Sequence, residues 1–511
     1  MSPAAHKWLS GALVSLGIFV ALLDTTIVDI VLPKMMPSLS TDLYGVQWVV
    51  IIYFVGAAVS MTAAAWVAAR IGARTAYILG LTVFVAASAL CGAAWDLPMM
   101  LIARFLQGLG EGLLVPVGMV ILFDVFPPEE HGAAMGLYGL AGSFSPALGP
   151  TLGGLITEHL NWRWVFYVNL PVGLLDIILI LFIIKGLNKR SKPHFDALGF
   201  GAIALALSAL IVMLGKGQEL GWMTSDLVVI LLTATIIFGV VAVLRMRFAS
   251  TPIFPRRVLK NPLLQVATLC MILLSINAYG FFLLLPVFLQ QLRGLTTLQA
   301  GLILLPGSIL TAIFTLISGV LCDRFDPRKI GCFTLLLTGI ASWGFTTDPD
   351  TPLHTLVSDY LLWGAMVGGT FVPAALLAIK TLRNEDVGHG STIQNVARLV
   401  AGSIGTALST ALISVRADSY TVATSYFMEP GRPNTDLFIQ ALNSLGSYYR
   451  PDVIGEAAYI GNQLIRRQTT SWAFHSVYQV LALFMFAGAA VFALSLKIKK
   501  APIPSEPKSR E

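Results

Sequence analysis

Long apolar stretches separated by short polar segments run along the whole chain. Each stretch holds about 20 mainly apolar residues, the length that a helix needs to cross a bilayer. Fourteen such stretches begin near residues 9, 45, 74, 98, 131, 164, 196, 225, 262, 297, 328, 352, 391 and 470. The pattern predicts an all-α polytopic membrane protein with fourteen transmembrane helices.

The composition agrees with a chain that lies mostly in lipid. Hydrophobic residues make up 56% of it and charged residues only 12%, whereas a soluble domain has about 25% charged residues. The net charge of +6 does not indicate nucleic-acid binding, because the basic residues fall in short loops between apolar stretches. We therefore expect the lipid bilayer, and no nucleic acid, as a partner.

The distribution of basic residues predicts the orientation. With the N-terminus inside, the inner loops and the C-terminal tail carry 22 of the 33 Lys and Arg residues, and the short outer loops carry four. Short cytoplasmic loops are enriched in Lys and Arg. Both termini of the multi-pass chain are therefore expected in the cytoplasm.

The segment 415–469 is too polar to span and becomes the one large outer element. Apolar residues recur at helical spacing from Leu437 to Leu445 and from Val453 to Leu464, which predicts two short amphipathic helices. Two interpretations remain open: a cap packed on the outer mouth, or a docking surface for a partner protein.

Two carboxylates interrupt the first apolar stretch, at LDTTIVDIVLP (23–33). A charged residue at the bilayer centre costs at least roughly 2.5–3.5 kcal/mol on insertion scales, so it usually marks a function. Asp24 and Asp29 are five residues apart and point about 140° apart on a helix. They cannot form one tight site, and at least one of them should face a central cavity.

Further charges lie within later stretches. Arg104 and Glu111 are two turns apart on one helix face, with their backbone positions roughly 10 Å apart. They are interpreted either as a buried ion pair, or separate hydrogen bonds to other helices, or as a proton relay or cation-binding carboxylate. Asp176 lies about half a membrane deep, and Asp359 lies near the outer end of its span.

Catalytic and cofactor motifs are absent from the sequence. The seven histidines are scattered, the four cysteines lack metal-ligand spacing, and no phosphate-binding glycine loop occurs. We therefore expect no enzyme activity, no metal and no cofactor. Without such a loop the chain is not expected to use ATP, and an ion gradient is the remaining energy source.

Two loops on the inner side resemble each other: AWVAARIGAR (65–74) after the second span and GVLCDRFDPRK (319–329) after the tenth. Related halves in a polytopic protein suggest a transporter with its site between the repeats. The residues expected at an inner gate are Arg70, Gly319, Asp323, Arg324, Arg328 and, on a later span, Arg398.

Six motifs in order resemble the major facilitator superfamily. They are LDTTIVDIVLP, RFLQGLGEGLLVP (104–116), SPALGPTLGG (145–154), NWRWVFYVNLPVG (161–173), the 319–329 loop and NVARLVAGSIGTALST (395–410). Together they resemble its fourteen-span drug:proton antiporter branch, of the EmrB type. The resemblance implies two six-helix bundles, 1–190 and 251–497, with two inserted helices in 191–250 and a cytoplasmic tail at 498–511.

The resemblance also implies a function: proton-coupled export of lipophilic drugs or toxic compounds by alternating access. It favours Asp24 as the coupling carboxylate, because the motif carries it. The antiporter motif would be Pro146, Gly149, Pro150, Gly153 and Gly154. The EmrB type implies a location in a bacterial inner membrane, a periplasmic adaptor protein and an outer-membrane channel. Export of one metabolite, such as a fatty acid, siderophore or antibiotic, and a non-transporting membrane sensor are the alternatives.

The sequence departs from the family pattern in places that add or remove charge. Asp29 stands where the family usually has Asn, and Glu111 where it commonly has a small residue. Ala65 and Ala69 replace a Gly and an Asp in the first loop, so the inner gate should depend mainly on the second copy. The candidate cavity-lining residues are Trp48, Tyr53, Gln107, Asn277 and Tyr279.

Overall fold

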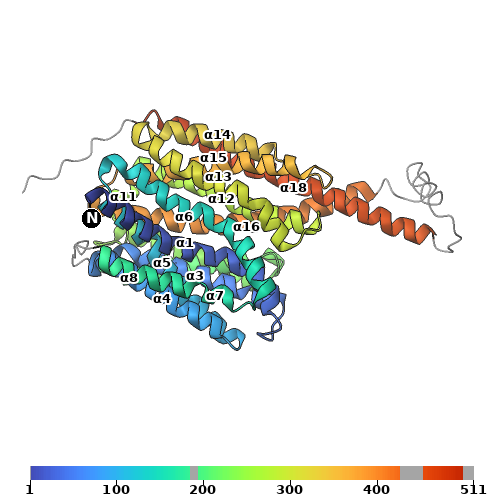
Figure 1. Ribbon diagram of the computed structural model, residues 1–511, viewed down its shortest axis with the longest axis horizontal. Helices are drawn as coiled ribbons and strands as arrows, with labels where there is room; N and C mark the ends of the chain where they lie inside the picture. Colours follow the sequence, from blue (N-terminus) through green and yellow to red (C-terminus); the bar gives the residue numbers. More distant parts are fainter. Residues whose placement is uncertain (1, 185–193, 426–452, 499–511) are drawn as a thin grey trace, which may run out of the picture.

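The computed structural model describes residues 2–184, 194–425 and 453–498, and the regular structure in these ranges is helical (Figure 1). The long helices are α1 Pro3–Met35, α3 Trp48–Ile71, α4 Ala73–Ala93, α5 Leu97–Val125, α6 His131–His159, α8 Asn169–Ile183, α9 Ala197–Lys216, α10 Asp226–Phe248, α12 Pro262–Gln291, α13 Thr297–Arg324, α14 Pro327–Trp343, α15 Leu353–Ile379, α16 Val387–Ser425 and α18 Val453–Ser495. The short ones are α2 Leu43–Val46, α7 Trp164–Tyr167, α11 Arg256–Leu259, η1 Pro128–Glu130, η2 Trp222–Thr224 and η3 Asn384–Asp386.

Each predicted span coincides with a helix, α7 and α8 together forming one of them. Twelve helices of the described chain are long and apolar enough to cross a membrane. Helices α6 and α14 are not among these twelve, and α14 has only 17 residues. The all-α polytopic fold is therefore confirmed, while membrane crossing by α6 and α14 stays a prediction.

Local sequence signals explain where several helices begin. Asp96, Asn261 and Asp326 precede α5, α12 and α14, and each side chain accepts a hydrogen bond from a backbone N–H of the first turn. A proline follows each cap within the first two positions. Such caps satisfy N–H groups that have no partner within the helix, and proline at the first turn loses no helical hydrogen bond.

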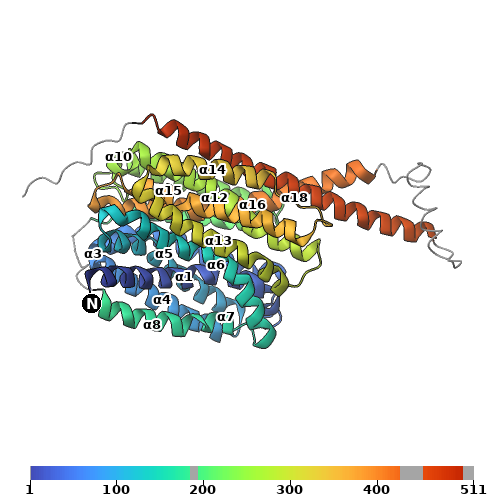
Figure 2. The ribbon, with the colours of Figure 1, turned by 45° about the horizontal axis from the view of Figure 1, so that its top comes forward.

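The helices form two bundles. The first contains α1, α3, α4, α5, α6 and α8, and the second contains α12 to α16 and α18 (Figures 1 and 2). Helices α6 and α13 join the bundles along their whole length, and glycines allow this approach: a Cβ on Gly132 would lie 2.2 Å from the Gly319 carbonyl oxygen, and one on Gly301 would lie 2.9 Å from Thr151 Oγ1. Close helix contacts in membranes characteristically use such small residues.

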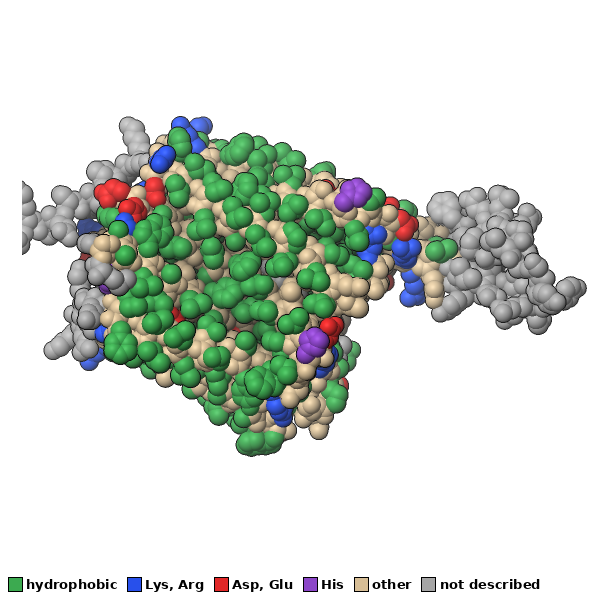
Figure 3. All heavy atoms as spheres, viewed as in Figure 1, with side chains coloured by type: hydrophobic (Ala, Val, Ile, Leu, Met, Phe, Trp, Pro, Cys, Tyr) green, Lys and Arg blue, Asp and Glu red, His purple; other side chains and the backbone are tan. Residues whose placement is uncertain are grey.

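The inserted hairpin α9–α10 packs on the outside of α3. At one end of α9 the rings of Phe195 and Trp66 lie 4.6 Å apart. At the other end Lys216 donates to the Tyr44 carbonyl at 2.6 Å. Large apolar side chains of α10 are exposed, and Figure 3 shows hydrophobic side chains covering the body of the molecule, with most charges toward its two ends. This distribution fits a lipid environment.

Helices α16 and α18 extend beyond the other helices on the side opposite the start of α1 (Figures 1 and 2). The helix predicted from Leu437 to Leu445 lies outside the described residues. The one predicted from Val453 to Leu464 is helical, but it is the first part of α18 and not a separate short helix. The prediction of a separate element was wrong because no helix-breaking residue lies between it and the last span.

Candidate functional site

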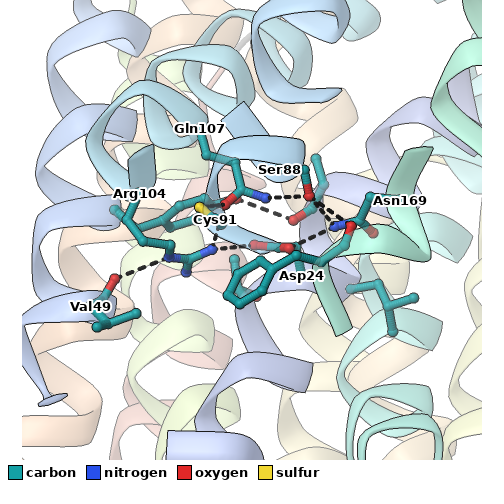
Figure 4. A network of polar contacts seen from close by, with 12 residues as sticks. Asp24, Val49, Ser88, Cys91, Arg104, Gln107 and Asn169 are labelled. Carbon is teal, nitrogen blue, oxygen red and sulfur yellow. Dashed lines mark hydrogen bonds and ion pairs between the residues drawn. The ribbon is translucent and has the colours of Figure 1, made fainter. Parts of the chain in front are cut away.

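A buried ion pair lies at the centre of the first bundle (Figure 4). Arg104 Nη1 of α5 donates to Asp24 Oδ2 of α1 at 2.5 Å, and both side chains are fully buried. Asn169 Nδ2 at the start of α8 donates to the other oxygen, Asp24 Oδ1, at 2.7 Å. Two helices, α5 and α8, therefore supply groups that neutralise and orient a carboxylate of α1.

A second layer of polar groups holds the Arg104 guanidinium in place (Figure 4). Arg104 also donates to Gln107 Oε1 at 2.8 Å and to the Val49 carbonyl at 3.1 Å. Gln107 Nε2 donates to Ser88 Oγ at 3.3 Å, and Ser88 Oγ also accepts from Asn169. Because buried polar groups are costly without partners, this network fixes the geometry of the ion pair.

The ion pair at the centre of this network is subject to two opposing electrostatic effects. Two charges in a low-dielectric interior attract each other strongly, yet their desolvation offsets much of that gain. A proton on Asp24 would remove the negative charge and leave Arg104 with neutral acceptors only.

The second carboxylate of α1 has a different environment. Asp29 is exposed, whereas Asp24 is fully buried. The difference follows from their separation by about 140° around the helix. Asp29 interacts electrostatically with Arg104 but lies outside the hydrogen-bonded network.

Glu111 lies halfway along α5 and does not pair with Arg104. The guanidinium turns instead toward α1, so the interpretation as an Arg104–Glu111 ion pair is not what the structure shows. Glu111 is 2% exposed, and its Oε2 atom has no hydrogen-bond partner. It lies beside the Tyr53 hydroxyl, and the charged group that acts on it most strongly is Arg398 of the second bundle.

Residues around Arg398 connect the two bundles. Arg398 Nη1 donates to the Tyr279 hydroxyl at 2.9 Å, within the second bundle. The Tyr138 hydroxyl of α6 donates to Asn395 Oδ1 of α16, also at 2.9 Å. Nearby, Ser391 Oγ donates to the Pro116 carbonyl of α5 at 2.9 Å. The polar face of α16 thus lies against the first bundle at mid-depth.

The remaining intramembrane carboxylates are isolated from these clusters. Asp176 of α8 is fully buried, and neither carboxylate oxygen has a hydrogen-bond partner. A Cβ on Gly17 would lie 2.7 Å from Asp176 Oδ2, so α1 passes close to this side chain. Asp359 accepts a hydrogen bond from the Thr346 N–H at 3.1 Å, near the beginning of α15.

The second-half loop contacts the first bundle at Gly319 and, through hydrogen bonds, at Asp323. Asp323 accepts hydrogen bonds from the backbone N–H groups of Gly132 at 2.6 Å and Ala133 at 2.9 Å, at the N-terminus of α6. A carboxylate at this position is stabilised by the helix dipole. Arg328 was expected to pair across the inner face, but it does not contact the first bundle. It binds Asp326 and carbonyl groups at the end of α18 instead. The other two basic candidates, Arg70 and Arg324, are exposed.

The proposed antiporter motif lies in α6, which is one continuous helix. A Cβ on Gly149 would lie 2.3 Å from Thr26 Oγ1 of α1, and one on Gly154 would lie 3.5 Å from Leu298 of α13. Gly153 is buried, and its carbonyl accepts from Thr157. The backbone of Pro146 and Pro150 belongs to α6, and their side chains lie outside the description.

Three of the five candidate cavity-lining residues lie away from Glu111 and Arg398. Asn277 is inside the second bundle, where Ser342, Leu481 and Trp363 satisfy its amide. Gln107 belongs to the buried network of Asp24, and Trp48 faces the inserted hairpin, with Lys216 Nζ 5.6 Å from its ring. The position of a residue along a span does not tell how the helix is rotated about its axis, and this rotation decides which neighbours a side chain faces. Tyr53 and Tyr279 do lie beside Glu111 and Arg398.

Sequence reasoning missed other members of the site as individual residues: Ser88, Asn169, Tyr138 and Asn395. Asn169 and Asn395 belong to quoted motifs, and a polar amide within an apolar span was the available signal. Ser88 gave no signal, because a small hydroxyl is common in transmembrane helices.

Comparisons with known proteins agree with this architecture. The family model of the Major Facilitator Superfamily matches residues 14–406. An uncharacterized MFS-type transporter of Bacillus subtilis, YhcA, is 32% identical over 405 residues, covering 78% of this chain and 75% of the relative. The multidrug export protein EmrB of Escherichia coli is 26% identical over 472 residues, covering 91% and 92%.

The solved structures give the same fold. The proton:xylose symporter XylE matches with a TM-score of 0.59 and 13% identity, covering 96% of this chain and 99% of that one. At this identity the match concerns the fold alone. The family match, the EmrB relatives and the two-bundle helical fold together show that this chain is a multi-pass membrane transporter, not an enzyme, and belongs to the Major Facilitator Superfamily, with the predicted EmrB-type resemblance confirmed.

Proposed function

We propose that the protein is a proton-coupled antiporter that exports lipophilic drugs or toxic compounds by alternating access. The single observation that carries this proposal is the fully buried ion pair of Asp24 and Arg104. The multidrug export relatives support the cargo class. Intramembrane carboxylates commonly act as proton relays in transporters.

The coupling follows from the electrostatics of the pair. When Asp24 is ionised, Arg104 binds it and α1 is held to α5. When a proton binds Asp24, the guanidinium keeps only the Gln107 oxygen, the Val49 carbonyl and the Tyr53 ring, whose centroid lies 4.0 Å from the Arg104 Cζ atom. The change of partners alters the packing of α1 and α5 and so biases the equilibrium between the two access states.

The proton gradient supplies enough free energy for such export. One proton that moves inward across 100 mV releases about 2.3 kcal/mol, which corresponds to roughly fifty-fold accumulation of cargo. In this proposal both termini are cytoplasmic in a bacterial inner membrane, as the basic loops predict. The face on which Asp323 binds α6 is then the cytoplasmic gate, and it is closed.

The extension of α16 and α18 is the proposed contact for a periplasmic adaptor protein, which would continue to an outer-membrane channel. The two helices contact each other through Thr421 and Thr469, 3.0 Å apart, while Val415 and Leu464 are exposed. An exposed apolar surface outside the membrane is typical of protein contacts. Co-purification of an adaptor with the native chain, lost after Val415→Asp and Leu464→Asp together, is the expected result.

Liposomes with an imposed pH gradient test the antiport. A lipophilic fluorescent cation and the internal pH are followed together, for the native chain and for Asp24→Asn. We expect gradient-driven dye movement with matched proton flux in the native protein, and loss of both in the variant. Exposed Glu158→Gln is the matched control, because it removes a carboxylate far from the pair. Full coupled flux in Asp24→Asn would show that another group carries the proton.

A further inference from the structure

We infer that the interface between the bundles binds an aromatic ampholyte, a molecule with a cationic and an anionic group, held between Glu111 and Arg398. This inference rests on the proposed function, because it names the cargo class of that exporter. It begins from the charges at mid-depth. Glu111 comes from the first bundle and Arg398 from the second, and each interacts electrostatically with the other.

The helices that carry the two charges meet across the interface, since Ser391 Oγ of α16 donates to the Pro116 carbonyl of α5 at 2.9 Å. Among the ion pairs that the described residues form, neither Glu111 nor Arg398 takes part in one. Glu111 Oε2 and Arg398 Nε are buried atoms without hydrogen-bond partners. Glu111 thus keeps one oxygen, and Arg398 one N–H beside its bond to Tyr279, that the protein does not satisfy. A ligand that brings groups of opposite charge would satisfy both atoms.

The arrangement selects the ligand by charge. A cation alone would neutralise Glu111 and place a positive charge near Arg398, and an anion alone would repel Glu111. A molecule with both groups satisfies both ends, and its carboxylate can receive the charge-assisted hydrogen bonds that guanidinium groups favour. Binding would also bridge α5 and α16, and therefore the two bundles.

Aromatic side chains complete the surroundings. Tyr53 lies beside Glu111, and Tyr279 binds Arg398. Tyr138 interacts electrostatically with both charges, and its hydroxyl already reaches Asn395 across the interface. Arg398 and Tyr279 are partly exposed. Rings at these positions can stack on an aromatic ligand and attract its cationic group.

A matched set of three probes tests the inference on the native protein in lipid nanodiscs, without a gradient. The probes are Nε-dansyl-lysine, which carries an ammonium and a carboxylate, its methyl ester, which is only cationic, and its Nα-acetyl derivative, which is only anionic. Dansyl fluorescence reports binding. We expect the zwitterion to bind about tenfold or more tightly than either derivative, since each loses one charged hydrogen-bonded contact.

Two variants test which protein residue binds each charged group of the ligand. Glu111→Gln should remove the preference over the acetyl derivative, and Arg398→Gln should remove the preference over the ester. Exposed Glu158→Gln and Arg247→Gln are the matched controls and should keep both preferences. Thermal unfolding checks that each variant folds, and the three probes on the native chain decide the question even if one variant does not.

Three results would overturn the inference: equal binding of the ester, equal binding of the acetyl derivative, or no binding of any probe to the native protein. The outcome is separable from that of the proposed function. Charge-selective binding without proton-coupled flux of any cargo would sink the antiport proposal alone. Coupled flux of a lipophilic cation without the charge preference would sink the ampholyte inference alone.

Discussion

Replacing Gly319 with alanine should open the gate on the face where α1 begins. A Cβ on Gly319 would lie 2.4 Å from the Gly132 carbonyl oxygen and 3.1 Å from the Gly136 Cα. Both neighbours are backbone atoms, which cannot rotate away as a side chain can. Since ordinary contacts are at least 3.4 Å, α6 and α13 must separate by about 1 Å at this point.

The separation determines the size of the effect. Asp323 lies one turn after Gly319 and accepts from the N–H groups of Gly132 at 2.6 Å and Ala133 at 2.9 Å. An added 1 Å takes both contacts beyond hydrogen-bond range. Bonds to a charged group contribute about 1.5–3 kcal/mol each when buried, and partial exposure lowers this. We expect a loss of about 2 kcal/mol for the closed gate, or roughly a thirty-fold shift in its equilibrium.

Hydrogen–deuterium exchange by mass spectrometry measures this shift directly. The peptide that contains Gly132 and Ala133 should lose protection by about thirty-fold in Gly319→Ala, and export should fall because the inner side no longer closes. Gly239→Ala is the matched control, since nothing lies within 4 Å of a Cβ at that position of α10. It should leave exchange in α6 unchanged.

Unchanged protection of this peptide, with normal export, would refute the reasoning. It would mean that α6 and α13 accommodate the methyl group without moving apart at Asp323. Asp323→Asn then separates the two contributions, because it keeps an acceptor but removes the charge. A larger effect of Asp323→Asn than of Gly319→Ala would mean that the charge of Asp323, and not the close approach of α6 and α13, holds this face closed.

Three further predictions concern charged residues. Arg104→Gln should cost about 3–5 kcal/mol of stability by leaving Asp24 buried without its partner, and the double variant with Asp24→Asn should recover most of the loss in thermal unfolding of the detergent-solubilised protein. In a background without native cysteines, Asp29→Cys should react with a membrane-impermeant thiol reagent added outside, and Asp24→Cys should not; equal reaction would contradict their different burial. At the start of α9, burial of Asp196 opposes ionisation, but hydrogen bonds from Arg245 and a backbone N–H outweigh it and hold the pKa of this carboxyl below its usual value. Its contribution to stability is therefore present above about pH 4 and lost as the pH falls further, so the stability difference between the native chain and Asp196→Asn should shrink in acid, as thermal unfolding at several pH values would show.

The sequence was sufficient for the helices, because a membrane-spanning helix is defined by length and apolarity alone. It was also sufficient to select Asp24 and Arg104, since a charge in an apolar span is visible without a structure. It was not sufficient to pair them. They are 80 residues apart, and their contact depends on the rotation of α1 and α5 about their axes, which the apolar pattern of a buried helix leaves undetermined.

The same limit explains the errors. Arg104 and Glu111 share a helix face, which suggested a common site, yet a long guanidinium side chain can turn to another helix, and here it does so. Asn277 was expected in a cavity because it is polar within a span, whereas the second bundle contains three partners for it. A polar residue in a membrane helix indicates that a partner exists, but not whether the partner is protein or cargo.

The positions of the two clusters suggest a physical route between the proposed proton site and the proposed cargo site. Asp24 and its partners lie within the first bundle, whereas Glu111 and Arg398 lie between the bundles. Tyr53 belongs to both surroundings: its ring lies 4.0 Å from the Arg104 Cζ atom, its hydroxyl donates to the Ala21 carbonyl, and it lies beside Glu111. In the proposed mechanism, a shift of Arg104 on protonation of Asp24 would therefore move or repolarise the ring that borders Glu111. Proton and cargo would not need to share one carboxylate, because Tyr53 would transmit the change from one site to the other.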